Sequence, residues 1–86
     1  MEDTETNVQA QYRETEDERI LEFRRNGKRL TVSVTKNGYG MLIVADETGE
    51  RERYYGFDMA IDHAAEALGV PASSLDVPED ARDMGM

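Results

Sequence analysis

Two Asn-Gly pairs, Asn26-Gly27 and Asn37-Gly38, stand between runs of apolar residues and constrain the fold more than any other feature of the chain. A two-residue hairpin turn of type I′ needs positive φ at both central residues, and Asn-Gly meets that need at the lowest steric cost. The pattern therefore predicts three antiparallel strands, over residues 18–25, 29–36 and 39–46, joined by two tight hairpins.

The two turns, read independently, agree on the inward face of the middle strand. The first turn places Leu21 opposite Val32, and the second places Val32 opposite Ile43. A slip of one residue would turn the whole apolar set outward, so burial favours this register. The inward residues of the middle strand are Leu30, Val32 and Val34, and their predicted partners on the third strand are Ala45, Ile43 and Met41.

A fourth strand is predicted over residues 51–55, after a turn at residues 46–50 in which Gly49 suits the left-handed position. A three-residue loop places Tyr55 on the inner face and Tyr54 on the outer face. The three-residue loop fits better, because threonine at position 48 is a poor residue for positive φ, and it sets Tyr54 opposite Leu42. A two-residue loop, which exchanges the two tyrosines, is the alternative.

Beyond Gly56 the apolar period changes to that of a helix, predicted over residues 58–68. Asp58 suits the N-cap, Gly69 suits the C-cap, and Pro71 prevents the helix from continuing. The apolar stripe consists of Phe57, Ile61, Ala64, Ala65 and Leu68. The expected fold is an α+β domain, a four-stranded antiparallel meander with one helix packed on one face.

Both ends of the chain are acidic and poor in apolar residues. Residues 1–17 offer little burial beyond Val8 and Tyr12, so we expect a largely disordered N-terminal tail. A single ββββα domain is expected over residues 18–77, and residues 78–86 are expected to fray.

The chain has 19 acidic and 10 basic residues, a formal charge of −9. This excess repels nucleic acids and anionic membranes, and concentrated salt relieves the self-repulsion. Scattered acids, acid-rich ends and arginine in preference to lysine resemble small, uncharacterised cytoplasmic proteins of salt-loving archaea. The resemblance is compositional, with no family motif, and implies a cytoplasm at molar salt. The lack of cysteine and of a long apolar segment agrees with a cytoplasmic location and with no membrane partner.

No cofactor, metal site or catalytic set is expected. His63 and Glu66 would share a helix face, but the sequence offers no second histidine and no obvious third ligand. The ordinary interpretation of this pair is a solvated helix surface. We therefore expect a protein that is not an enzyme.

Two surfaces are candidates for binding. In the predicted register the outer sheet face has an apolar patch rimmed by charge, which favours self-association or docking on another protein unless the chain's own tails cover it. The alternative is a nucleic-acid-associated protein that uses the basic tip of the first hairpin, although ion pairs within the sheet would also satisfy these charges. The patch consists of Ile20, Leu42, Val44 and Tyr54, and the basic tip of Arg24, Arg25, Lys28 and Arg29.

Overall fold

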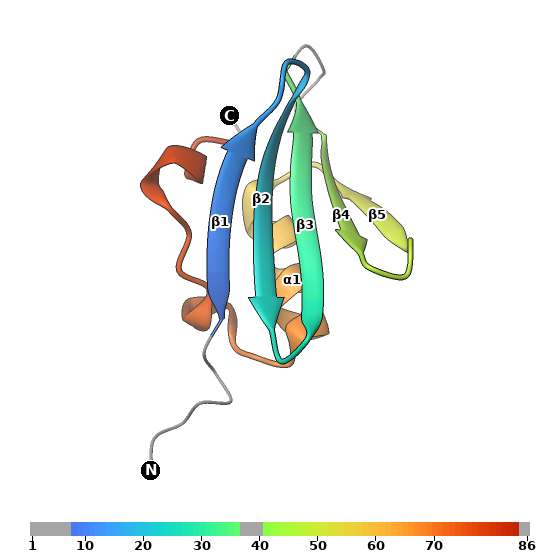
Figure 1. Ribbon diagram of the computed structural model, residues 1–86, viewed down its shortest axis with the longest axis vertical. Helices are drawn as coiled ribbons and strands as arrows, with labels where there is room; N and C mark the ends of the chain where they lie inside the picture. Colours follow the sequence, from blue (N-terminus) through green and yellow to red (C-terminus); the bar gives the residue numbers. More distant parts are fainter. Residues whose placement is uncertain (1–7, 37–40, 85–86) are drawn as a thin grey trace.

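Five antiparallel strands form one sheet in chain order, and helix α1 lies across one face of it (Figure 1). The computed structural model describes residues 8–36 and 41–84. The strands are β1 (Gln9–Glu14), β2 (Glu18–Arg25), β3 (Lys28–Thr35), β4 (Leu42–Asp46) and β5 (Arg51–Tyr54). They are followed by α1 (Phe57–Leu68) and two short 3₁₀ helices, η2 (Ala72–Ser74) and η3 (Glu79–Ala81). We call the face that α1 covers the inner face, and the opposite one the outer face.

The first hairpin forms as predicted. Asn26 and Gly27 both have positive φ, 50° and 84°, as a type I′ turn requires. Leu21 pairs with Val32 and Phe23 with Leu30. The side chains of β2 and β3 that were expected to face inward are buried.

The predicted register between β3 and β4 is wrong by one residue. Val32 pairs with Val44, and Val34 pairs with Leu42. Leu42 and Val44 therefore enter the core, and Ile43 faces outward. Residues 41–45 are apolar without a break, so the alternation that normally fixes a register is missing from this strand. The expected turn at residues 37–38 lies outside the described residues.

The turn between β4 and β5 is the three-residue loop with Gly49 in the left-handed position, at φ 97°. The Asp46 carboxylate accepts hydrogen bonds from the backbone N–H groups of Thr48 and Glu50, at 2.9 and 3.1 Å. Tyr54 pairs with Leu42, as this loop predicts. The one-residue shift exchanges the two faces of β4, so Tyr54 faces inward and not outward as its place in the predicted apolar patch required. Tyr55 is 80% exposed.

Strand β1 corrects the expected four-stranded sheet and, within residues 8–17, the expected disordered tail. It pairs along its length with β2, so Ala10 lies opposite Phe23 and Tyr12 opposite Leu21. The Thr15 hydroxyl accepts a hydrogen bond from the backbone N–H of Glu18 at 3.0 Å and holds the connecting turn. An edge strand can form on so few apolar groups because β2 supplies both its hydrogen-bond partners and its hydrophobic neighbours.

Helix α1 begins one residue earlier than predicted, and its N-cap is Gly56, which makes no side-chain cap bond, rather than Asp58. Gly69 is the C-cap, as expected, with φ 77°. The helix packs its small and branched side chains on the sheet: Ala60, Ile61, Ala64, Ala65 and Leu68.

The C-terminal segment also differs from expectation, because the part of residues 78–86 that the structure describes packs on the body of the protein. Ala81 and Met84 are buried at 0% and 2% exposure. Arg19 of β2 donates hydrogen bonds from Nη2 to the backbone carbonyl of Asp80, at 3.0 Å, and to the Asp83 carboxylate. An arginine on the sheet thus holds an acidic segment that sequence composition alone would leave free.

Candidate functional site

Neither end of the described chain crosses the outer face of the sheet. β1 extends the sheet sideways, and the C-terminal segment joins the core that α1 forms on the inner face (Figure 1). Within residues 8–36 and 41–84, the outer face is therefore an uncovered surface of the sheet. It is the candidate docking surface.

The four residues predicted as its apolar patch do not lie together. Leu42 and Val44 are buried in the core at 0% and 2% exposure, because of the register shift of β4. Tyr54 faces inward, and its ring centroid lies 5.3 Å from that of His63 on α1. Ile20 alone occupies the outer face.

The row across the centre of the outer face combines two isoleucines with two arginines. Ile20 lies opposite Ser33, and Ser33 lies opposite Ile43. Arg13 of β1 pairs with Ile20 at one end of the row, and Arg53 of β5 pairs with Ile43 at the other. Both isoleucines are partly exposed. The row offers apolar contact at its centre and positive charge at its ends.

Arginine dominates the charge of the whole outer face. By strand alternation, five arginines and two glutamates of the five strands point outward, a net charge of +3 on a chain whose formal charge is −9. The rest of the chain therefore carries −12. The arginines are Arg13, Arg24, Arg29, Arg51 and Arg53, and the glutamates are Glu18 and Glu22.

Glu22 is the buried acid of this face, at 4% exposure. Its carboxylate accepts a hydrogen bond from Nε of Arg24 at 2.6 Å and another from Nη1 of Arg13 at 3.1 Å. The bond from Arg24 is the main reason that the pKa of Glu22 lies below its ordinary value; burial opposes the shift, and Arg13 adds to it. Glu22 thus remains ionised and orients two arginines across neighbouring strands.

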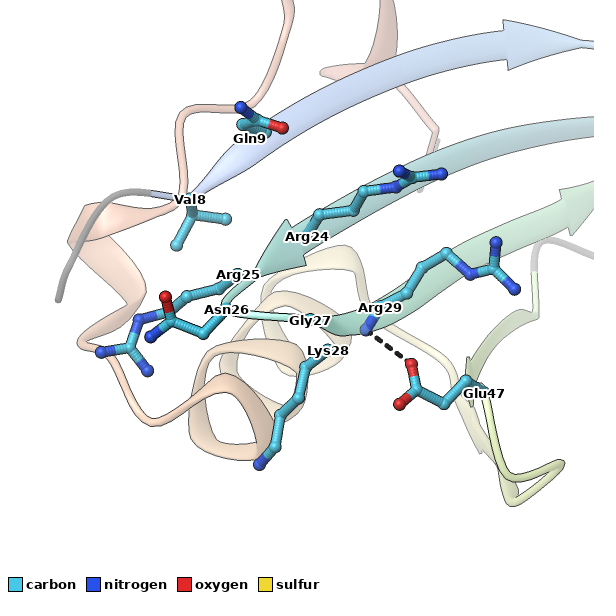
Figure 2. Close-up of a pocket in the computed structure, with 9 residues that line it drawn as sticks. All are labelled: Val8, Gln9, Arg24, Arg25, Asn26, Gly27, Lys28, Arg29 and Glu47. Carbon is cyan, nitrogen blue, oxygen red and sulfur yellow. Dashed lines mark hydrogen bonds between the residues drawn. The ribbon is translucent and has the colours of Figure 1, made fainter. Parts of the chain in front are cut away.

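The basic hairpin tip is divided between the two faces (Figure 2). Arg24 and Arg29 lie on the outer side. On the inner side, Arg25 donates from Nη1 to the Leu68 carbonyl at 2.6 Å, and Lys28 donates from Nζ to the carbonyl of Ala67 at 3.3 Å.

Arg25 and Lys28 lie at the C-terminal end of α1, where positive charge stabilises a helix. The last turn of α1 has no basic residue of its own, and its C-terminal carbonyls carry partial negative charge. Two of the four residues proposed for nucleic-acid contact therefore have a structural role.

A hollow of about 660 Å³ opens beside the hairpin tip. Figure 2 shows Glu47 next to Arg29 there, and the Glu47 carboxylate accepts a hydrogen bond from the Arg29 backbone N–H at 3.0 Å. The lining is mostly basic and polar: Val8, Gln9, Arg24, Arg25, Asn26, Gly27, Lys28, Arg29 and Glu47. The hollow extends the positive surface to the end of the sheet.

Other chemistry is sparse in the described part of the chain. His63 lies beside Tyr54, whose hydroxyl donates to the Glu52 carboxylate at 3.0 Å. Among residues 8–36 and 41–84, no three histidine, cysteine or acidic side chains come together as metal ligands do. No helix of that part has the length and apolarity needed to cross a membrane.

Sequence reasoning singled out Arg24 and Arg29 but missed the other three arginines of the outer face, Arg13, Arg51 and Arg53. The alternation Arg51-Glu52-Arg53 was a usable signal, because it directs two arginines to the same side of β5. Arg13 was missed together with β1. Ile43 was assigned to the core, and only the register of β4 places it outside.

Residues 2–86 match a family of unknown function, DUF7111, and the chain belongs to that family. No curated protein and no solved structure matched it.

Proposed function

We propose that the protein is a binding module whose outer sheet face docks on an acidic surface of a protein partner. The observation that supports this function is the concentration of arginine on an uncovered face of a strongly acidic chain. Ile20 and Ile43 add apolar contact area between Arg13 and Arg53. Partner surfaces commonly combine such apolar centres with arginine.

Charge complementarity selects the chemistry of the partner. A face of +3 on a body of −12 attracts an acidic surface only when that surface meets the outer face, so electrostatics would orient the encounter. Two copies that met outer face to outer face would bring like charges together. A symmetric dimer through this face is therefore disfavoured.

A nucleic-acid partner has weaker support. Arg25 and Lys28 are engaged at the end of α1, and Arg24 is paired with Glu22. Stacking of bases would require aromatic side chains on the outer face, whereas the aromatic residues of the five strands, Tyr12, Phe23 and Tyr54, lie on the inner face.

Fluorescence anisotropy with two labelled probes of equal charge tests the proposal. One probe is an acidic amphipathic peptide and the other is an oligothymidylate, both at about 0.1 M KCl, where surface charges are only partly screened. We expect the peptide to bind more tightly, and Arg53→Glu to weaken its binding at least about tenfold, a loss of about 1.4 kcal/mol.

Arg82→Glu is the matched control, because it makes the same charge change at an exposed position of the C-terminal segment. It should weaken peptide binding much less than Arg53→Glu. Tighter binding of the oligonucleotide, with loss in Arg53→Glu, would establish the nucleic-acid alternative instead. Equal binding of the peptide by both variants, or no binding by the wild type, would overturn the proposed function.

A further inference from the structure

The described residues include two exposed large hydrophobic side chains, one at the end of β5 and the other on α1. Tyr55 is 80% exposed and Met59 is 57% exposed. Tyr55 directly follows Tyr54, the last residue of β5, and so lies at the end of the strand that carries Arg51 and Arg53 on the outer face. Met59 belongs to α1, which lies behind the sheet (Figure 1).

Met59 lies within an acidic stripe on the solvent side of α1. Asp58, Asp62 and Glu66 recur every four residues, and all three are exposed. At 3.6 residues per turn, Met59 falls on the same side as Glu66, directly opposite the buried stripe. This stripe carries −3, equal and opposite to the +3 of the outer sheet face.

Each molecule therefore has one exposed aromatic side chain at the end of β5, the strand that carries Arg51 and Arg53, and one exposed methionine within the acidic stripe of α1. The two surfaces face in opposite directions, because the domain has only two layers, the sheet and the helix layer (Figure 1). A surface that is complementary to a different surface of the same chain gives a head-to-tail contact, which remains open unless rotation closes it.

We propose that the occupant of the outer sheet face is a second copy of this chain, which docks by the acidic stripe of α1. This partner assignment rests on the proposed function of that face. In the contact, Arg51 and Arg53 meet carboxylates of the stripe, and Tyr55 meets Met59. The assembly is an open stack rather than a closed dimer, since every docked molecule presents a free outer face or a free stripe.

The size of the face limits the strength of this contact. The five strands contain 6, 8, 8, 5 and 4 residues, and each residue covers about 16 Å² of the sheet, at about 3.3 Å along the strand and about 4.8 Å between strands. The face thus offers roughly 500 Å², less than the value of about 800 Å² per partner in a stable interface. Association is therefore weak and reversible, and the mean mass rises with the concentration of the chain.

A pair of complementary variants tests the head-to-tail contact. The face variant carries Arg53→Gln and Tyr55→Ser, and the stripe variant carries Met59→Ser and Glu66→Gln. Sedimentation velocity at about 0.1 M KCl should show that each variant alone remains a monomer, whereas the mean mass of the wild-type assemblies rises with concentration. An equimolar mixture should form a one-to-one dimer and stop there, because the intact stripe of one variant meets the intact face of the other.

The control variant, Arg82→Gln, should assemble like wild type, and all variants should keep the wild-type circular dichroism spectrum. Self-association of either variant alone at the wild-type level, or a mixture that remains monomeric, would overturn the head-to-tail contact. Wild type that is monomeric throughout but still binds the acidic peptide would overturn the second copy as partner and leave the proposed function intact. If wild type neither self-associates nor binds the acidic peptide, both proposals fail.

Discussion

At the scale of single residues, Glu22 has the most demanding environment of any acid in the described chain. It is nearly inaccessible to water, on a face otherwise open to it, and depends on Arg24 and Arg13 for compensation. A buried charge without such partners would be strongly destabilising. We therefore expect Glu22→Gln to lower the free energy of unfolding at pH 7 by about 1–3 kcal/mol, measured by urea denaturation.

The effect of Glu22→Gln should depend on pH in a defined direction. The folded-state pKa of Glu22 is depressed below its ordinary value near 4.5, so its contribution is present above that value. It is lost as the pH falls through the folded-state pKa, where the wild-type carboxyl also becomes neutral. A difference between wild type and variant that persists undiminished to the most acidic pH at which both fold would contradict this account.

At the scale of elements, β4 offers a direct test of register. Val44 is 2% exposed on the inner face, and Ile43 is its neighbour on the outer face. Val44→Asp places an unpaired carboxylate in a small core and should unfold the protein. Ile43→Asp should leave it folded, with a change in melting temperature of a few degrees. Circular dichroism of the two variants distinguishes this register from the alternative, in which their effects would be exchanged.

Much of the architecture could be predicted because local signals agreed with tertiary ones. Asn26-Gly27 fixes the first hairpin through its backbone preferences, and Gly49 and Gly69 fix a turn and a helix end in the same way. The register of β4 could not be predicted, because residues 41–45 present apolar groups to both faces. The apolar patch inferred from that register is therefore wrong, and the concentration of arginine on the outer face was not predicted.

The two ends of the chain show a different limit of prediction. β1 and the C-terminal segment are ordered by contacts to β2, above all those of Arg19 with Asp83, Asp80 and Tyr12. The contacts of Arg19 with Asp80 and Asp83 join residues more than sixty positions apart. Composition describes only how little each segment can bury by itself, so it cannot reveal a partner that the rest of the fold supplies.

The contact between the first hairpin and the end of α1 gives a second prediction for elements. Arg25→Met retains the aliphatic stem but removes the donor to the carbonyl of Leu68. We expect a loss of about 1 kcal/mol in unfolding free energy, and faster amide hydrogen exchange in the last turn of α1. Arg29→Met, on the outer side of the same hairpin, should change stability by less than about 0.5 kcal/mol. Equal effects of the two substitutions would argue against a capping role.

At the scale of the whole molecule, we expect salt to act on stability through the net charge. A formal charge of −9 on 9.7 kDa produces self-repulsion that falls as the Debye length shortens. The melting temperature should rise clearly between about 0.1 M and about 2 M KCl. Scanning calorimetry across this series provides the measurement, and a flat or falling melting temperature would remove the salt-adapted interpretation.

The order of the strands has a consequence for folding during synthesis on the ribosome. Because strand order follows chain order, each strand that leaves the ribosome finds its neighbour already present. Such short-range pairing favours rapid folding. The residues that cover the inner face, 57–84, are synthesised last, so the nascent sheet carries a bare apolar side until they arrive. A chain stalled before Phe57 would thus be the most aggregation-prone form of this protein, and a chaperone would find its substrate there.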